Sequence, residues 1–273
     1  VDGVKIRNYL QSREEWVIHD IQSAFTHYVP KFVRRKYIDK PGKKEKRPLG
    51  IPTIRDRIVQ ECVRIVLEPI MEAQFYEHSY GFRPMRDTKM ALERIVGTVH
   101  QNGWHWIVEG DISKCFDRID HSILLKRLYH MGVKDRRLLQ IIKQMLKAGI
   151  MDECEVNEEG TPQGGILSPI LANIYLNELD MKLEEIQNRF KKPHERKYTY
   201  EYSVMKGRRD YQKAKLKKAK EDEKAEILDR IEEYTKALYG IPRTPADDKN
   251  LYFVRYADDF LIAIKGSKED CIA

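Results

Sequence analysis

Cysteines are few in this sequence, and long apolar runs are absent. The four cysteines, Cys62, Cys115, Cys154 and Cys271, are widely spaced, which argues against a zinc site and gives no indication of disulfides. The eight histidines form no His-Glu-X-X-His pattern, so the common zinc-hydrolase motif is excluded. No apolar run reaches the roughly 18 residues that a membrane span requires. The sequence therefore predicts a globular protein of a reducing compartment, with no membrane partner.

Positive charge is in excess and is unevenly distributed. The 273 residues carry a formal net charge of +7, and 34% of them are charged. The stretch from Lys31 to Arg57 contains eleven Lys or Arg against three acidic residues, a local net charge of +8. A basic excess favours a polyanionic partner such as nucleic acid without identifying it. Two interpretations of the stretch stand: a solvated basic face, or an element that contacts phosphates.

A basic hairpin is predicted within this stretch. Residues Arg34 to Ile38 and Arg47 to Ile51 have strand character, and Pro41-Gly42 between them is typical of a type II turn. Both arms are rich in Lys and Arg, which disfavours burial in a core. Such a hairpin is expected to close over a triphosphate or a template backbone.

Two further predicted strand regions place acidic residues at a strand end and at a turn. Trp104 to Asp111 is predicted to be a buried strand, and Leu251 to Ile264 a hairpin with Asp258 and Asp259 at its turn. Gly160 to Gly165 is predicted to be a loop that leads into a helix with Ser168 as its cap and Pro169 at its first position.

The adjacent carboxylates Asp258 and Asp259 have two interpretations by themselves. Aspartate favours turns, but repulsion between neighbouring carboxylates at a partly buried turn is costly unless a cation binds. Asp111 ends a different apolar strand, so three carboxylates from two strand ends can meet in one cleft. Hard oxygen ligands suit Mg²⁺, and two such ions about 4 Å apart stabilise the attacking and leaving oxygens of a phosphoryl displacement. The sequence therefore predicts a polymerase site with two Mg²⁺ ions.

The segment Met181 to Asn250 differs in composition from the rest. It contains nineteen basic and fourteen acidic residues, and a narrow apolar stripe of Leu228, Ile231, Tyr234 and Leu238. This pattern is typical of a mostly solvated helical insertion. A plain surface insertion and an RNA-contacting arm are both consistent with it.

Several motifs together resemble the group II intron-encoded reverse transcriptases. Retron, telomerase and retroviral enzymes share the two acidic motifs but match the other motifs less well. The matching strings occur in the family's order and cover nearly all of the chain outside Met181 to Asn250. They are Arg47 to Thr53 with Asp56-Arg57 and Gln60, Gly81 to Pro84, Asp111 to His121, Gly160 to Pro169 with Ala172 to Leu176, and Tyr256 to Asp259.

The resemblance implies roles for individual positions. Asp111, Asp258 and Asp259 match the catalytic ligands of the two Mg²⁺ ions, and Ile112 matches a position whose backbone carbonyl completes a metal shell. Phe116 matches the aromatic steric gate, which crowds a ribose 2′-hydroxyl and so favours deoxynucleotides. The alternative role for Phe116 is that of an ordinary core phenylalanine, which its spacing within the motif disfavours.

Nucleotide contacts are implied at further positions. Gln163 and Gly164 match residues that line the nucleotide site, where glycine permits close approach of the backbone. Arg47 matches a fingers residue that contacts the triphosphate, and Lys40 is expected to share that role.

RNA contacts are expected from the basic segments. Arg83 has two alternatives, contact with the template or pairing inside the protein. The other candidates are lysines of the predicted hairpin turn and of the insertion, namely Lys43, Lys44, Lys213, Lys215, Lys217 and Lys218.

The fold class implied by the resemblance is α+β, a right-hand polymerase with fingers and palm, an antiparallel palm sheet with packed helices, and a helical insertion. The expected division is residues 1–100 for the fingers, 101–180 for the first part of the palm, 181–250 for the insertion and 251–273 for the catalytic hairpin. Because the chain begins at Val1 and ends 14 residues after Asp259, it is expected to be a fragment cut before the thumb. Such a fragment should hold primer and template poorly.

The function implied is that of an RNA-directed DNA polymerase which also acts as a maturase for its intron. Its expected partners are the intron RNA, an RNA template with a DNA primer, and deoxynucleoside triphosphates, with a homodimer left open. The expected setting is a bacterial cytoplasmic ribonucleoprotein. Two alternatives remain: an RNA-binding splicing cofactor with little polymerase activity, and an RNA-templated RNA polymerase, against which Phe116 argues.

Overall fold

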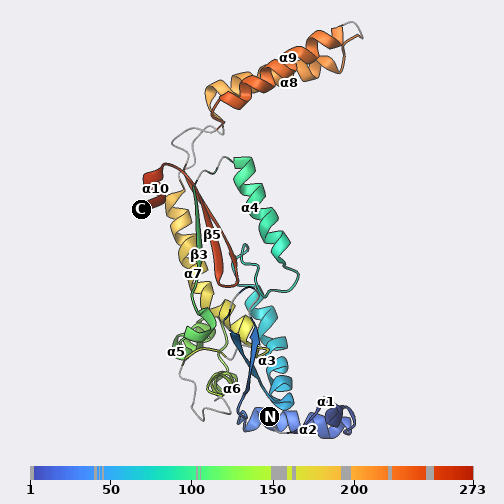
Figure 1. Cartoon of the computed structure of the whole chain (residues 1–273), viewed down its shortest axis with the longest axis vertical. Coiled ribbons are helices and arrows are strands. Elements are labelled where there is room, and N and C mark those ends of the chain that lie inside the picture. Colours follow the sequence, from blue (N-terminus) through green and yellow to red (C-terminus); the bar gives the residue numbers. More distant parts are fainter. Residues whose placement is uncertain are drawn as a thin grey trace. The chain divides into compact units, whose positions relative to one another are not determined.

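The computed structural model describes residues 3–39, 42, 44, 46–102, 104, 106–148, 159–161, 164–191, 198–220, 223–243 and 249–272 (Figure 1). Helices and strands mix along the chain, as an α+β fold requires. The helices are α1 (Ile6–Leu10), α2 (Glu14–Thr26), α3 (Ile54–Glu72), α4 (Thr88–Asn102), η1 (Cys115–Arg118), α5 (His121–His130), α6 (Arg136–Leu146), α7 (Ser168–Phe190), α8 (Tyr200–Leu216), α9 (Lys224–Gly240) and α10 (Lys268–Ile272). The strands are β1 (Arg34–Asp39), β2 (Lys46–Ile51), β3 (Trp106–Asp111), β4 (Asn250–Tyr256) and β5 (Asp259–Lys265).

The chain divides into two compact units. Unit 1 comprises residues 1–91, 110–182 and 254–260, and unit 2 comprises residues 92–109, 183–253 and 261–273. The predicted acidic residues Asp111, Asp258 and Asp259 all fall in unit 1.

The core of unit 1 lies among helices. Val59, Leu67, Leu124 and Ile142 have no exposed surface, and Ile174 of α7 joins them in one apolar cluster. The buried residues recur at helical spacing along α3, α5, α6 and α7, so each helix presents one apolar face. The faces of α2, α3, α5, α6 and α7 thus pack into a helical platform.

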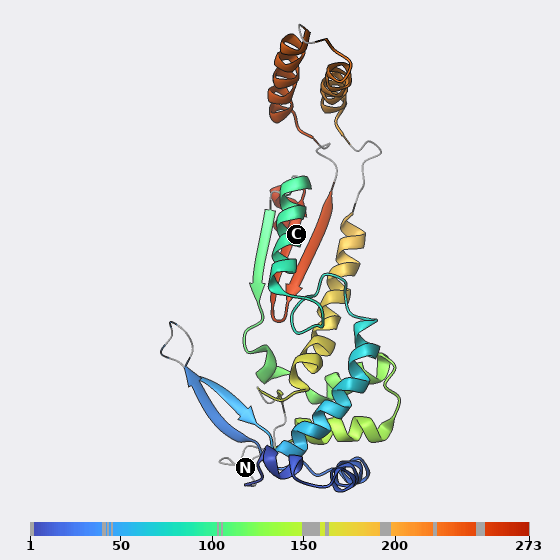
Figure 2. The same cartoon turned by 90° about the vertical axis from the view of Figure 1, so that its right-hand side faces the viewer.

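The predicted basic hairpin is confirmed. Strands β1 and β2 pair antiparallel, with Arg34 opposite Ile51 and Asp39 opposite Lys46 (Figure 2). Gly42 in the connection has a φ of +73°, which suits the glycine position of a type II turn. Pro41 lies outside the described residues.

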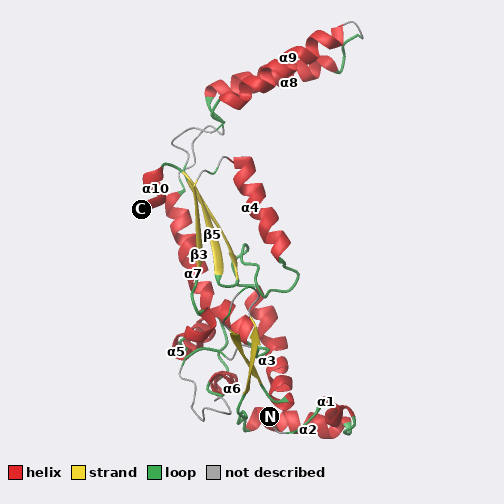
Figure 3. Cartoon of the chain, viewed as in Figure 1, coloured by secondary structure: helices red, strands yellow, loops and turns green. Residues whose placement is uncertain are grey.

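The second sheet has the strand order β3-β5-β4 (Figure 3). Near the start of β3, Trp106 Nε1 donates to the Gly266 carbonyl, which follows β5, at 3.2 Å. After the end of β3, the Ile112 amide donates to the Asp258 carbonyl, just before β5, at 3.2 Å. The two strands therefore run antiparallel, as predicted.

A strand was predicted from Trp104 to Asp111 and is present as β3, but the prediction that this strand is buried is wrong. Strand β3 exists, but its residues are exposed or half-buried, and Ile107 is 51% exposed. Its exposed side chains lie on both faces of the sheet, so neither face is fully covered along β3. An apolar composition alone does not show whether the faces of a strand are covered.

The insertion in unit 2 is helical, as predicted, and its two helices α8 and α9 form a hairpin. Helices α8 and α9 lie side by side in both views (Figures 1 and 2). The predicted apolar stripe is wrong at one position, because Leu228 is 52% exposed and Ile227 is buried in its place. Ile227 belongs to the stripe because it lies four residues before Ile231 and eleven before Leu238, which keeps all three on one helix face.

Two absences hold for the described part of the chain. None of its helices combines the length and the apolar character needed to cross a membrane. The described cysteines Cys62, Cys115 and Cys271 are all free thiols.

Candidate active site

The ends of two neighbouring strands bring Asp111 and Asp258 together. Asp111 is the last residue of β3, and Asp258 lies in the turn between β4 and β5. The hydrogen bond from the Ile112 amide to the Asp258 carbonyl joins the two backbones directly after Asp111. Asp111 is exposed, and Asp258 is half-buried. Both carboxylates therefore stand at the same end of the sheet, where water and ligands have access.

The electrostatics of the neighbouring thiol agree with this convergence. Burial raises the pKa of Cys115 to about 11, and the negative charges of Asp258, Asp111 and Asp117 add to the rise. The guanidinium of Arg255 acts in the opposite direction. A negatively charged neighbourhood disfavours the thiolate, so these carboxylates add to the larger effect of burial on the pKa of Cys115.

A buried arginine holds the turn that carries Asp258. Arg255 has no exposed surface, and its Nε and Nη2 atoms donate to the two carboxylate oxygens of Asp180 at 2.7 and 2.5 Å. Its Nη1 atom donates to the Ala257 carbonyl at 2.8 Å and to Asn173 Oδ1 at 3.1 Å. The guanidinium thus ties the turn to helix α7 with its charge fully compensated.

The backbone of the turn is strained and tightly packed. Ala257 has a φ of +56°, a left-handed conformation that costs energy for a residue other than glycine. Gly81 lies so close that a Cβ there would come within 2.2 Å of the Ala257 amide nitrogen. The Gly81 carbonyl accepts a hydrogen bond from Asn173 Nδ2 at 2.8 Å. Helix α7 therefore positions both the turn and the loop that covers it.

A glycine also brings β3 and β5 into register at their active-site ends. A Cβ at Gly110 would come within 2.3 Å of the Phe260 ring, so the ring covers the strand where a side chain is missing. Gly110 precedes Asp111, and Phe260 follows Asp259. The packing of this pair fixes the strand ends from which the carboxylates project.

Phe116 is presented by a short 3₁₀ turn that the next motif anchors. Lys114 precedes the turn with a φ of +56°, and the Phe116 carbonyl accepts from the Thr161 amide at 2.8 Å. The Gly160 amide donates to the Ile119 carbonyl at 2.8 Å, and His121 Nε2 contacts the Gly160 carbonyl at 2.6 Å. The Gly160-Thr161 segment therefore holds the backbone beneath the aromatic ring.

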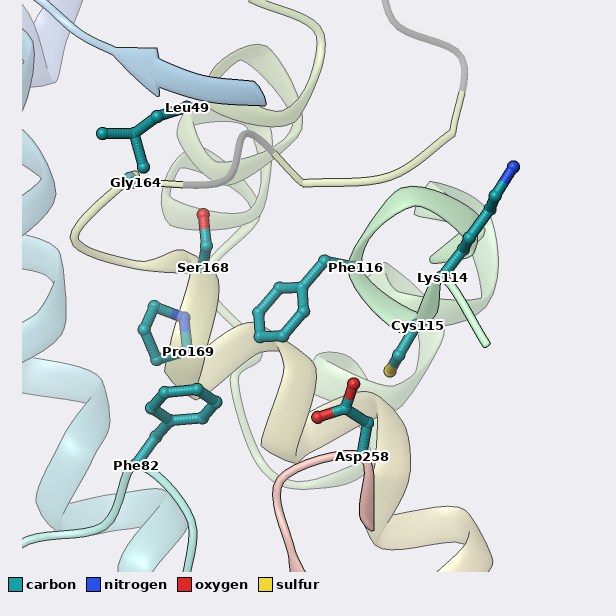
Figure 4. A pocket seen from close by; sticks show the side chains of 10 residues that line it. Leu49, Phe82, Lys114, Cys115, Phe116, Gly164, Ser168, Pro169 and Asp258 are labelled. Carbon is teal, nitrogen blue, oxygen red and sulfur yellow. The ribbon is translucent and has the colours of Figure 1, made fainter. Parts of the chain in front are cut away.

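A cavity of about 360 Å³ opens beside these residues (Figure 4). Figure 4 places the Phe116 ring between Pro169 and the Asp258 carboxylate, with the Phe82 ring below Pro169. Gly164 forms part of the wall with a φ of +107°, and a Cβ there would come within 2.8 Å of the Gly50 carbonyl. The cavity has the size of a small-molecule site, with an acid at one side and aromatic rings at the other.

The chemistry of the acids fits a divalent cation in part. Carboxylate oxygens are the ligands that Mg²⁺ prefers, and Asp258 lines the open cavity. Within the described residues, however, no group of three or more Asp, Glu, His or Cys side chains has metal-binding geometry. Asp259 is exposed and begins β5. The structure thus places Asp111 and Asp258 at neighbouring strand ends, with Asp259 directly after Asp258, but the described residues form no ready-made set of three ligands.

The remaining predicted residues fall into three groups. Lys40, Lys43 and Gln163 lie outside the described residues, as does the side chain of Arg47, whose backbone belongs to β2. Lys44 is exposed between β1 and β2. The exposed lysines on and directly after the end of α8, in unit 2, are Lys213, Lys215, Lys217 and Lys218.

Of the two alternatives for Arg83, template contact and pairing inside the protein, the structure shows the pairing. It is 6% exposed, and its guanidinium donates to the Glu72 carboxylate and to the carbonyls of Tyr76 and Ser79. These bonds occupy guanidinium N–H donors that a template phosphate would need. The expectation that Arg83 contacts RNA is therefore corrected, because the residue is part of the loop's internal structure.

Sequence reasoning missed the residues that position the turn. The pattern around Arg255 predicts only an alternating strand, and no motif singles out Asn173 or Asp180 for a role. A signal was present, because the polar residues Asn173, Asn177 and Asp180 follow helical spacing on α7 and all are buried. Polar residues on the inner face of a helix predict buried hydrogen-bonding partners elsewhere in the chain.

Together, an antiparallel sheet with acids at neighbouring strand ends and a nucleotide-sized cavity define a polymerase palm. The profile of the family described as "Reverse transcriptase (RNA-dependent DNA polymerase)" matches residues 38–202, and the chain belongs to this family. A solved structure of telomerase from Candida albicans in complex with a fragment of telomeric RNA has a TM-score of 0.51. The two chains are 12% identical, and the match covers 95% of this chain and 42% of the other, so the likeness concerns the fold alone.

Relatives identify the branch of the family. The chain is 45% identical over 246 residues to the group II intron-encoded protein LtrA of Lactococcus lactis subsp. cremoris, covering 89% of this chain and 41% of that protein. It is 39% identical over 257 residues to an uncharacterized 91 kDa protein in the cob intron of Schizosaccharomyces pombe, covering 92% and 30%. It is 34% identical over 276 residues to protein YkfC of Escherichia coli, covering 98% and 64%. These similarities support the resemblance to group II intron-encoded reverse transcriptases. The chain spans about two fifths of the length of LtrA.

Proposed function

We propose that this chain carries the polymerase centre of a group II intron-encoded enzyme that copies RNA into DNA and assists its intron as a maturase. One observation supports this proposal above the others. Asp111 and Asp258 stand at neighbouring strand ends beside an open cavity that Phe116 walls. An enzyme that joins nucleotides needs acids and a shaped nucleotide pocket in this relation.

Two Mg²⁺ ions are proposed as the cofactors. Asp111, Asp258 and Asp259 would hold them, with the Ile112 carbonyl as a further oxygen ligand. When bound, the ions supply charge neutralisation for the attacking 3′-hydroxyl and the departing pyrophosphate. The residues of the chain supply the positioning, since Arg255 fixes the Asp258 turn and the Gly110–Phe260 contact fixes the strand ends.

Phe116 is proposed to select the sugar. Its ring lines the cavity that Asp258 also lines, so a nucleotide bound there presents its ribose near the ring. A 2′-hydroxyl would need space that the ring occupies, and deoxynucleoside triphosphates are therefore preferred. The proposed nucleotide contacts also include Gly164 in the cavity wall, together with Gln163, Arg47 and Lys40.

RNA is the proposed template and structural partner. LtrA is named as a group II intron-encoded protein, and the C. albicans telomerase was solved with an RNA fragment. In this chain the exposed lysines of the insertion and Lys44 of the hairpin are the proposed phosphate contacts. An RNA-binding splicing cofactor with little polymerase activity is the competing proposal, and the acids beside the cavity favour the enzyme.

The test is single-nucleotide extension of a DNA primer on an RNA template with Mg²⁺, using enzyme in excess. A single addition is chosen because it does not require processive synthesis. Asp258→Asn should lower the rate by roughly a thousandfold, since several kcal/mol of transition-state stabilisation are lost. Asp117→Asn is the matched control, because Asp117 is an exposed acid of the same motif that the proposal does not make a ligand.

The outcomes separate the two proposals. A selective loss in Asp258→Asn, with activity retained in Asp117→Asn, supports the polymerase. Equal extension by the unaltered chain and Asp258→Asn would show that the acids are not catalytic. RNA binding without extension by the unaltered chain would favour the splicing cofactor.

A further inference from the structure

We propose that Phe82 is a specificity-determining residue of the nucleotide site, which acts by holding the ring of Phe116 in place. The inference rests on the proposed function, because it concerns how the polymerase site distinguishes deoxynucleotides from ribonucleotides. Phe82 lies on the loop between α3 and α4, far in sequence from the acidic motifs. Its role is separate from metal binding and from the chemical step.

The geometry of the two rings carries the inference. The ring centroids of Phe82 and Phe116 are 5.9 Å apart, and the ring planes meet at 81°. This edge-to-face arrangement is one of the favoured geometries of an aromatic pair, because the positive edge of one ring meets the negative face of the other. Both rings line the same cavity (Figure 4). Phe82 is therefore the aromatic neighbour that the gate ring meets across the site.

The backbone at Phe82 is held in a costly conformation. Its φ is +58°, which a bulky residue rarely adopts, and such strain persists only when the surroundings enforce it. Both neighbours are fixed. The Gly81 carbonyl accepts from Asn173 Nδ2, and the Arg83 guanidinium is bound by Glu72 and by the carbonyls of Tyr76 and Ser79.

This strain does not serve the core. Phe82 is 52% exposed, so the conformation directs a large apolar side chain into an open cavity instead of burying it. A residue that is strained, rigidly flanked and exposed at a ligand cavity is a candidate for ligand recognition. Here the ring it contacts is the one that decides which sugar fits.

Discrimination by a steric gate depends on the gate being rigid. A ribonucleotide differs from a deoxynucleotide by one oxygen atom, so a small rotation of the Phe116 ring would admit it. The hydrogen bond from Thr161 fixes the backbone of Phe116 but not its ring. The contact with Phe82 limits the rotation of that ring, and a recognition group must be locked by its neighbours to select sharply.

The test measures kcat/KM for a deoxynucleotide and for the matching ribonucleotide in single-nucleotide extension on RNA. Phe82→Ala should lower the ratio of the two values by about two- to tenfold, the span expected from one edge-to-face pair. Phe82→Gly should lower it equally, and glycine also relieves the strained φ, so its folding is secure. Met85→Gly is the matched control, since Met85 has a φ of 57° in the same loop but is 94% exposed and outside the cavity lining.

A double-variant cycle with Phe116→Ala distinguishes holding the gate from direct contact with the sugar. If Phe82 acts through Phe116, Phe82→Ala should change the ratio little once Phe116 is already alanine. Additive effects would overturn the inference, and so would an unchanged ratio in both Phe82 variants. A weaker KM for primer and template with an unchanged ratio would overturn it too, and would assign Phe82 to the template instead.

Failure of the proposed function is visible separately. It would appear as no extension and no discrimination in the unaltered chain, which would overturn both proposals. An unaltered chain that extends primers and discriminates, with Phe82 variants that discriminate equally well, would overturn this inference alone.

Discussion

Arg255 and Asp180 form a doubly hydrogen-bonded ion pair in which neither side chain has any exposed surface. The pair joins strand β4 to helix α7, 75 residues apart in the sequence. Arg255 also donates to the Ala257 carbonyl, one residue before the proposed catalytic Asp258. The ion pair therefore links the stability of the unit to the position of the active-site turn.

Removing one partner of this pair should be strongly destabilising. Asp180→Ala leaves a buried guanidinium without its counter-charge, and the expected loss is about 3–5 kcal/mol in the free energy of unfolding. Urea denaturation followed by circular dichroism measures it. Lys236→Ala is the control, because its pair with Glu232 is exposed and screened by water, so its loss should change the free energy of unfolding little. Equal losses in the two variants would contradict the role of the buried pair.

The double variant Asp180→Leu with Arg255→Met separates stability from positioning. Apolar residues of similar volume avoid an unpaired buried charge, so most of the lost stability should return. The Ala257 carbonyl would still lack its donor, so primer extension should stay impaired. Full recovery of extension would show that the arginine contributes only stability.

Gly81→Ala should disrupt the active-site turn. An added Cβ would lie 2.2 Å from the Ala257 amide nitrogen, so the turn or the loop must shift, and overpacking of this kind costs about 1–3 kcal/mol. Thermal unfolding and primer extension should both be affected. Gly97→Ala is the control, because nothing lies within 4 Å of a Cβ there and α4 should gain about 0.5–1 kcal/mol. Parallel behaviour of the two alanine variants would contradict the close contact at Gly81.

Tyr28 should make stability fall at high pH. Burial and the hydrogen-bonded Asp56 carboxylate raise the pKa of Tyr28 well above its ordinary value of 10.0. Because the folded pKa is the higher one, the contribution is fully present below pH 10 and is lost as the pH rises through the folded pKa, while unfolded chains ionise first. The difference in stability between the unaltered chain and Tyr28→Phe should therefore shrink by about 1.4 kcal/mol per pH unit above pH 10. Denaturation of both proteins from pH 9 to 11 measures it, and a constant difference would contradict the shift.

The exposed lysines on and directly after the end of α8, here called the α8 set, should contribute to RNA affinity through phosphate contacts. Alanine at all four should reduce the dependence of log affinity on log salt by up to about 3, since each contact to a single strand contributes about 0.7. Filter binding at several salt concentrations measures the slope. The lysines are Lys213, Lys215, Lys217 and Lys218.

The control removes the same charge from exposed lysines of α5 and α6 and the turns after them. An equal change in slope for both sets would indicate a general charge effect, and no change for the α8 set would show that the insertion is not an RNA arm. The control lysines are Lys126, Lys134, Lys143 and Lys147.

Local pattern predicted much of the fold. The alternation and turn chemistry around Gly42 predicted the β1–β2 hairpin, and the acidic turn at Asp258 predicted the β4–β5 hairpin. These features depend on residues close in the sequence, so they can be predicted without knowledge of the tertiary contacts. The exposure of β3 was predicted wrongly, because the burial of a strand depends on which elements cover its two faces, and only the tertiary fold decides that.

The sequence by itself determined the family, and its motifs gave the residues proposed for the active site. Asp111, Asp258 and Phe116 are predicted from those motifs, which can be read along the chain without tertiary contacts. Only the tertiary structure decided that Arg255 and Asp180 pair, that Arg83 bonds to groups inside the protein, and that the rings of Phe82 and Phe116 are in contact. The physical reason is that a buried charge or a strained ring is defined by partners distant in sequence, and such partners become neighbours only when the chain folds.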